Sequence, residues 1–262
     1  MRHIYRHEMR QYWKTLLLWS ICVGGMGMAC ILLYSGMQEE MAGMAESFAA
    51  MGAFSAAFGM DHLSIATLKG FYASEVGTIH ELGGAMFAAV VSMTMLSKEE
   101  DGHTSEFLFS LPIARGKVVW TKWCVVCTNL LLFHVLCVGF YGLGFLLLGE
   151  GIPGKELLLY HVMQLLLGLE MAGICFAVSA FFRQNRLGVG LGLVLLFYAY
   201  DLVSRVAPEM EKLSILSPFS YANASKILGT GEIAAGGALL GVGALVLALG
   251  TAYVKYTGKD QM

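Results

Sequence analysis

Residues 149–155 of this sequence read GEGIPGK, which is the spacing of a loop that binds phosphate through backbone N–H groups and a lysine. Glu156 follows that lysine, at the place where such loops carry the Ser or Thr that holds magnesium. The pattern around the loop also predicts no preceding strand. We therefore predict that the chain has no ATPase site of its own.

Two further motifs have the spacing of metal sites, but their surroundings do not support that chemistry. Cys124 and Cys127 form a CxxC pair inside an apolar stretch, with no second pair to complete four zinc ligands. His80 and Glu81 begin like a metalloprotease helix, yet Gly84 stands where the second histidine is required. We predict no metal site and no catalytic residue. All six cysteines lie in apolar stretches, which is typical of small hydrophobic side chains.

Several ionisable residues lie within long apolar stretches, where an unpaired charge is costly. Glu170 shares a helical face with Met163 and has no basic residue within reach on its own helix. It is predicted to line a substrate path, to pair with another helix, or to be protonated. Asp201 and Arg205 are four residues apart, so we predict that they pair with each other.

The elements that carry these residues are predicted to be membrane-spanning helices. Hydrophobic residues make up 57% of the chain and charged residues 14%, against about 25% charged in a soluble domain. A spanning helix needs roughly 20 mostly apolar residues. Apolar runs and their charged flanks place six spans near 15–36, 77–96, 121–146, 157–181, 187–206 and 235–255, and all four prolines lie between them. The sequence predicts an all-α integral membrane protein, with residues 1–262 as a single transmembrane domain.

Lys and Arg residues are concentrated in segments 1–14 and 97–117 and in the short connection that holds Arg183 and Arg186. If six spans are present, these three segments lie on the same side of the membrane. Because basic residues favour the inner side, we predict a multi-pass cell-membrane protein with both termini cytoplasmic. Segment 1–14 is basic and aromatic, so it is either an interfacial helix on the membrane lipid or a plain positive flank. The net charge of −2 gives no indication of nucleic-acid binding.

Glycine pairs with GxxxG spacing occur in the last two predicted spans, at Gly188 and Gly192 and at Gly237 and Gly241. Such pairs let helix backbones approach closely. We predict that both pairs pack within one helical bundle rather than forming a dimer seam.

Segment 97–117 has an acidic start, an amphipathic middle and a basic end. Phe107, Leu108 and Leu111 form an apolar stripe, and Pro112 ends the helix. The acidic first half disfavours a position flat on the anionic inner leaflet. The pattern is therefore typical of a docking helix.

This segment resembles the membrane subunits of type-2 ATP-binding-cassette exporters. Those proteins carry, after their second span, a stretch of the form E-x-x-x-G-T-x-E-x-L-L-S-x-P-I-S-R followed by Lys. The matching residues here are Glu99, Gly102, Thr104, Glu106, Leu108, Ser110, Leu111, Pro112, Ile113, Arg115 and Lys117. Residues 216–221, LSPFSY, also resemble the family's outer segment before the last span. His103 and Ala114 depart from the pattern, which leaves the subfamily and the substrate unassigned.

The resemblance implies a permease with six spans, an interfacial N-terminal helix and a cytoplasmic coupling helix between spans two and three. That helix would dock on a separate ATPase subunit through Glu99, Glu100, Gly102, Thr104, Glu106, Phe107, Leu108, Leu111, Pro112, Arg115 and Lys117. ATP and Mg would be bound by the partner, and no cofactor by this chain. A second permease subunit, either another copy or a related chain, would complete an exporter of a hydrophobic or amphipathic substrate such as a peptide or drug.

Two other functions compete with this interpretation. A secondary transporter or channel would use Glu170, Glu81 and His80 as an ion relay, and internal symmetry would favour it. The sequence contains no convincing repeat. An intramembrane hydrolase would need His, Glu or Asp side chains that converge from facing helices. The scattered candidates do not supply such a set.

Overall fold

The computed structural model describes residues 1–52, 55, 63–105, 110, 112–151 and 154–259. Every regular element in these residues is helical, which confirms the predicted all-α class. The elements are α1 (Arg2–Ala49), α3 (Leu68–Phe71), η1 (Tyr72–Val76), α4 (Gly77–Ser92), α5 (Lys98–Asp101), α7 (Arg115–Leu148), α8 (Gly154–Ser179), α9 (Leu187–Val206), η2 (Pro208–Leu216), η3 (Ser220–Ala222), α10 (Ala224–Thr230) and α11 (Ala235–Thr257).

Five of the described helices are long and apolar enough to cross a membrane: α1, α7, α8, α9 and α11. They coincide with five of the six predicted spans. The remaining predicted span, 77–96, corresponds to α4, which has 16 residues and is shorter than the roughly 20 that a bilayer requires. The π-helical turn η1 and α3 continue α4 toward its N-terminal side, so the helical run begins at Leu68.

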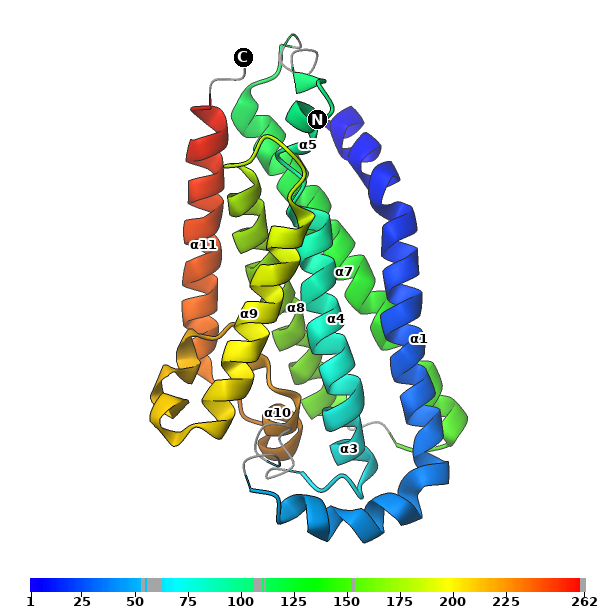
Figure 1. Cartoon of the computed structure of the whole chain (residues 1–262). Helices are drawn as coiled ribbons and strands as arrows, with labels where there is room; N and C mark the ends of the chain where they lie inside the picture. Colours follow the sequence, from blue (N-terminus) through cyan, green and yellow to red (C-terminus); the bar gives the residue numbers. More distant parts are fainter. Residues whose placement is uncertain (53–54, 56–62, 106–109, 111, 152–153, 260–262) are drawn as a thin grey trace.

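The first helix, α1, is continuous from Arg2 to Ala49, whereas the sequence predicted a separate interfacial helix at 1–14 and a span at 15–36. No proline lies in this part of the chain, so nothing in the sequence forces the helix to stop at either predicted boundary. Figure 1 shows α1 following one side of the bundle and then turning, so that its last part crosses one end of the molecule.

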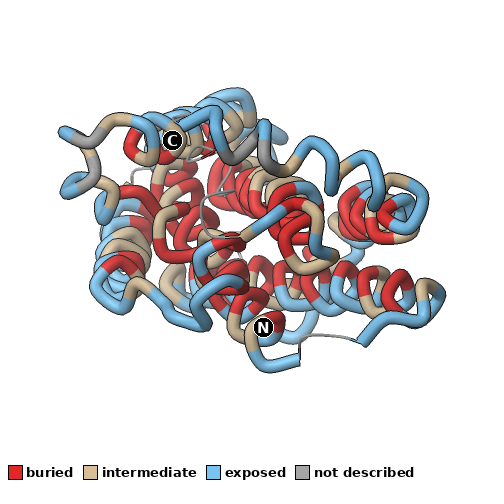
Figure 2. The backbone as a smooth tube through the Cα atoms, turned by 90° about the horizontal axis from the view of Figure 1, so that it is seen from below, coloured by how far each residue is buried: buried red, intermediate tan, exposed pale blue. Residues whose placement is uncertain are grey.

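Helix α8 is the central helix of the bundle. Within its most apolar stretch 67% of the residues are buried, against 22% to 39% in the other four long helices. Helices α4, α7 and α11 pack against it. In Figure 2 the buried residues gather on the inner sides of the helices and the exposed ones outside.

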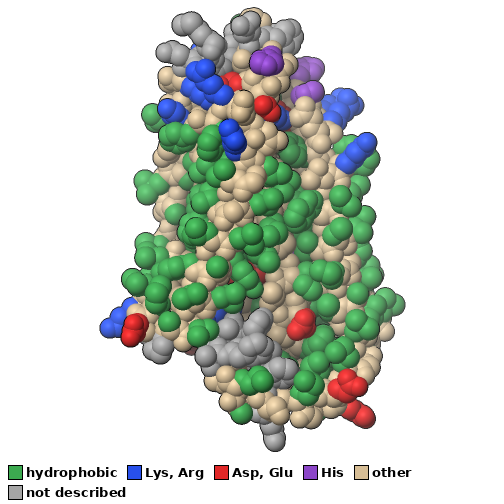
Figure 3. Space-filling view, in the orientation of Figure 1, with side chains coloured by type: hydrophobic (Ala, Val, Ile, Leu, Met, Phe, Trp, Pro, Cys, Tyr) green, Lys and Arg blue, Asp and Glu red, His purple; other side chains and the backbone are tan. Residues whose placement is uncertain are grey.

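The outer surface is strongly apolar, as expected for contact with lipid. Leu147, Leu239 and Leu247 are each more than 70% exposed. Figure 3 shows hydrophobic side chains over the middle of one face, while most charged side chains lie toward its two ends and the visible histidines lie near the upper end. Five long apolar helices with this surface identify a membrane protein.

The start of α1, the end of α11 and helix α5 lie together at one end of the bundle, which we call the terminal end (Figure 1). The opposite end, which holds α3, α10 and the turn of α1, is the distal end.

Candidate functional site

Helix α5 begins the segment that the sequence singled out, and its starting point is fixed by packing. Met93, Met95 and Leu96 form the turn between α4 and α5, and each is at most 1% exposed. The Lys98 backbone N–H donates to the Thr94 carbonyl at 3.1 Å, which closes the turn. The start of α5 is therefore part of the core at the terminal end.

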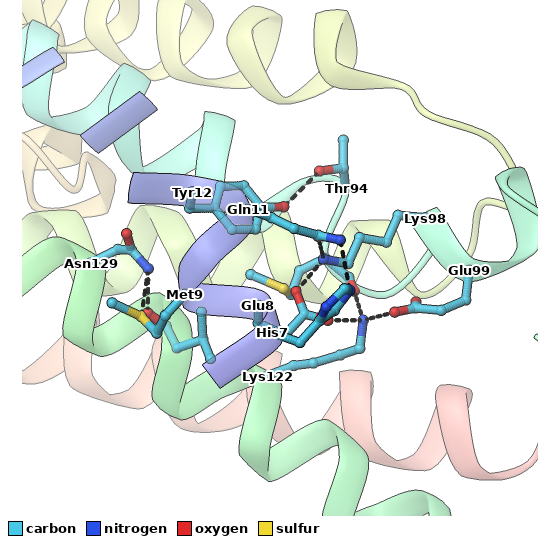
Figure 4. A network of polar contacts seen from close by, with 12 residues as sticks. His7, Glu8, Met9, Gln11, Tyr12, Thr94, Lys98, Glu99, Lys122 and Asn129 are labelled. Atoms are coloured by element: carbon cyan, nitrogen blue, oxygen red, sulfur yellow. Dashed lines mark hydrogen bonds and ion pairs between the residues drawn. The ribbon is translucent and has the colours of Figure 1, made fainter. Parts of the chain in front are cut away.

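Two lysines and two glutamates join α5 to α1 and α7, and we call them the lysine–glutamate cluster: Glu8, Lys98, Glu99 and Lys122 (Figure 4). Lys122 Nζ, on α7, is fully buried and lies 2.5 Å from Glu99 Oε1 and 3.4 Å from Glu8 Oε1. It also donates to the Met95 carbonyl at 2.5 Å. Lys98 Nζ donates to the other oxygen of Glu8, Oε2. Glu8 thus bridges both lysines.

The charges of this cluster balance, which makes its burial feasible. Burial by itself raises the pKa of Glu8, but the positive charges of Lys122 and Lys98 outweigh burial. Together they hold the pKa of Glu8 below its ordinary value of 4.5. Glu8 is therefore ionised at neutral pH and is only 2% exposed.

A second group of charges, the Glu100 cluster, ties the other side of α5 to the opposite half of the bundle. Glu100 Oε1 lies 2.7 Å from Lys259 Nζ, just beyond α11, and Glu100 Oε2 lies 3.7 Å from Arg183 Nε, between α8 and α9. Arg115 Nη1, at the start of α7, donates to the carbonyls of Lys259 at 2.9 Å and Thr257 at 3.3 Å. The adjacent glutamates of α5 therefore contact different parts of the bundle, Glu99 at α7 and Glu100 near the ends of α8 and α11.

Some of the predicted docking residues are partly buried against the bundle, and others are exposed to solvent. Glu99 and Glu100 point into the bundle and form internal ion pairs, whereas Arg115 is half-buried against the end of α11. The exposed members of the set are Gly102, Thr104, Pro112 and Lys117. The remaining predicted members, Glu106, Phe107, Leu108 and Leu111, lie outside the described residues.

Glu8, Lys122 and Lys259 were not among the predicted site residues. Glu8 is the one acidic residue in the basic segment 1–14, which is a detectable anomaly in the sequence. Lys122 lies at the apolar start of a predicted span, where a buried lysine requires a partner. Neither position alone identifies that partner, because the contacts join different helices: Glu8 is 90 positions from Lys98, and Lys122 is 23 positions from Glu99.

Glu170 lies in the second half of α8 and is 4% exposed. Its Oε2 accepts a hydrogen bond from Tyr221 Oη at 2.7 Å, and it lines a cavity of about 330 Å³. Met163, on the same helix, is buried in the core and is not part of that cavity's wall. The structure therefore does not bring the two predicted path residues into one site.

Asp201 and Arg205 pair on α9 as predicted, with Asp201 Oδ2 at 2.5 Å from Arg205 Nη2. Glu81 of α4 joins them, with its Oε1 3.7 Å from the same nitrogen. The pair is thus part of a contact between two helices.

Three histidines from three helices meet inside the bundle, and sequence spacing gave no sign of this. The rings of His134 and His161 each lie 5.0 Å from the ring of His80. Tyr141 Oη lies 2.9 Å from His80 Nδ1, and Tyr72 Oη lies 3.0 Å from His161 Nε2. His80 and its neighbour Glu81 consequently belong to different polar clusters.

No group of three or more His, Cys, Asp or Glu side chains within the described residues has a metal-binding arrangement. The six cysteines, all of which are described, are free thiols.

The GxxxG prediction is confirmed for one glycine pair and wrong for the other. A Cβ at Gly237 or Gly241 would lie close to the Tyr221 side chain, so this pair does permit close packing. A Cβ at Gly188 or Gly192 would have no atom within 4 Å. That pair lies on the exposed side of α9, because α9 packs mainly on α4 and η2.

The family model described as "ABC-2 family transporter protein" matches residues 2–261, which is almost the whole chain. No curated protein matches the sequence.

Proposed function

Because the chain belongs to the ABC-2 family transporter protein family, we propose that it is the permease subunit of an exporter driven by a separate ATPase subunit. The placement of segment 102–117 carries the proposal. This segment starts from α5, which ion pairs hold to both halves of the bundle, and its described residues Gly102, Thr104 and Pro112 are exposed at the terminal end. Exposed residues that follow a rigidly attached helix suit the transmission of motion from a docked partner.

The two glutamates of α5 have an internal role in this proposal. A partner that moves segment 102–117 would pull on α7 through Glu99, on α1 through the Lys98–Glu8 pair, and on the ends of α8 and α11 through Glu100. The ATPase itself would contact residues that follow Gly102, including Glu106 and Leu108. Glu99 and Glu100 are thus anchors of the docking segment and not part of its outer surface.

The remaining features of the transporter follow from this arrangement. The run of α3, η1 and α4 would be a sixth span, which puts the terminal end and both chain ends in the cytoplasm. A second permease subunit, another copy or a related chain, would pack beside this one, and the exposed glycine face of α9 suits such a contact. The cargo would be a hydrophobic or amphipathic molecule, with ATP and Mg bound only by the partner.

Gentle purification of the tagged chain from its native membrane tests the central claim. We expect a protein that contains the ATP-binding motif GxxxxGK[ST] to co-purify in a stable ratio. Recovery of the intact permease in native lipid with no such protein would refute the proposal.

A pair of substitutions tests the docking surface itself. Replacing Glu106 and Leu108 with alanine should abolish ATPase association and leave thermal unfolding of the permease unchanged. The matched control replaces Glu232 and Ile233, an exposed acidic and apolar pair at the distal end, with alanine. Loss of the ATPase from the control, or its retention by the first variant, would show that docking lies elsewhere.

The structure offers no observation that favours the ion-relay alternative. Glu170 accepts a hydrogen bond from Tyr221, Glu81 lies 3.7 Å from Arg205, and His80 lies 2.9 Å from the Tyr141 hydroxyl, so the three proposed relay residues have separate partners.

A further inference from the structure

A cavity of about 330 Å³ lies between α8, α11 and the chain that leads into η3. Most of its wall is aliphatic or glycine, including Leu240, Gly241, Ala244 and Leu247 of α11. Its size falls at the lower end of the roughly 300–1,000 Å³ that small-molecule sites occupy. The cavity therefore suits an apolar molecule of modest length.

Among the described residues that line this cavity, Glu170 is the one carboxylate and none is Lys or Arg. Four carboxylate side chains are buried in the described part of the chain. Glu8, Glu81 and Asp201 each lie within 4 Å of a Lys or Arg nitrogen, whereas Glu170 forms no ion pair with any described residue. Buried charges in proteins are normally paired. Glu170 is thus the one buried carboxyl group among the described residues with no Lys or Arg nitrogen within ion-pair distance.

The position of the Glu170 carboxylate is set by its neighbours. Tyr221 Oη donates to Oε2 at 2.7 Å, and the second oxygen has no partner among the described residues. A Cβ at Gly241 would collide with Oε2 and lie 3.0 Å from the Tyr221 ring, so a larger residue there would displace the end of the Glu170 side chain. The fold holds the acid against the cavity wall and leaves one oxygen available.

We propose that this cavity binds a lipophilic cation, with an amine or similar group on the Glu170 carboxylate and a hydrocarbon body along α11. The inference rests on the proposed function, because it names the class of substrate that the permease would carry. A single acid in an apolar wall gives orientation and charge selectivity, and the aliphatic wall contributes most of the contact area.

The test uses two photoreactive probes that differ only in their head group: dodecylamine and dodecanol, each with a diazirine in the chain. The purified permease in lipid nanodiscs is labelled with each probe, and labelled peptides are mapped by mass spectrometry. We expect the amine to label residues 237–247 at least about tenfold more strongly in the wild type than in Glu170→Gln. Labelling by the alcohol should be equal in the two proteins.

Glu156→Gln, on the same helix but outside the cavity, is the matched control and should label like the wild type. Tyr221→Phe should reduce amine labelling without removing it, because it loses one positioning hydrogen bond. Equal labelling by amine and alcohol in the wild type, or unchanged amine labelling in Glu170→Gln, would overturn the proposal.

Labelling needs no ATPase, so its outcome is independent of the co-purification experiment. In the reconstituted complex with its ATPase, dodecylamine should stimulate ATP hydrolysis by the wild type and not by Glu170→Gln. Binding without any such stimulation would refute the role of the cavity as a substrate site.

Discussion

Replacing Glu8 with glutamine should destabilise the terminal end by about 2 kcal/mol. Removing one member of a buried ion pair costs about 3–5 kcal/mol when the other charge is left uncompensated. Here Lys122 keeps Glu99 at 2.5 Å and the Met95 carbonyl, and the Lys98 side chain is 21% exposed to water. The expected loss is therefore below that range.

Thermal unfolding of the purified permease, followed by intrinsic fluorescence, measures this loss. A change of about 2 kcal/mol corresponds to a midpoint lower by about 4–8 °C in a protein of this size. Glu39→Gln is the control, because Glu39 is exposed on the same helix and its replacement should change the stability by less than about 0.5 kcal/mol.

A double-mutant cycle distinguishes the interaction between Glu8 and Lys122 from a general effect of removing a charge. Lys122→Met removes the buried cation that Glu8 helps to compensate, so Glu8→Gln should cost less in that background. Equal costs in the two backgrounds, or a Glu8→Gln midpoint equal to that of the wild type, would refute the role we give to Glu8.

Four further outcomes follow from the same structure. Since the pKa of Glu8 is lowered on folding, the stability that Glu8 contributes is complete above its ordinary pKa of 4.5 and is lost as the pH falls below it; the wild type and Glu8→Gln should converge there in unfolding experiments. Arg205→Met leaves two buried carboxylates without their cation and should lower stability by about 3–5 kcal/mol, measured by the same unfolding assay. Gly241→Ala should cost about 1–3 kcal/mol through overcrowding, whereas Gly243→Ala, with no atom within 4 Å of its Cβ, should unfold like the wild type. Gly192→Leu should leave the unfolding midpoint unchanged but weaken permease self-association in native mass spectrometry.

The spans were predictable because hydrophobic length and proline placement act locally. Helix α9, Leu187–Val206, begins and ends at the predicted residues, and α11 differs only by two residues at its end. The start of the second span was harder to predict. Its helical run begins at Leu68 and continues through Tyr72 and Glu75, and these polar residues interrupt the apolar pattern from which a span is recognised.

The site was less predictable, since its decisive contacts are long-range. The motif around Glu99 could be located in the sequence, but the direction of its side chain could not, because Lys122 lies on another helix. Similarly, Glu170 stood out as a buried acid, whereas its partner Tyr221 and the space left by Gly241 depend on how α8 packs against α11. Local pattern thus identified the unusual residues, and tertiary packing determined their partners.

Helix α11 connects the two regions that the proposals describe. Lys259, just beyond its end, pairs with Glu100 at the root of the docking segment, while Gly241 in its first half lies against the Glu170 carboxylate. No proline interrupts α11, so a displacement of its end is carried along the helix as a nearly rigid body. A shift of α5 that draws Lys259 sideways would therefore move Gly241 relative to α8. Because Gly241 has no free space on that side, such a movement must change the position of the carboxylate and the shape of the cavity. Coupling between ATP hydrolysis and cargo binding then needs no contact between the ATPase and the cavity.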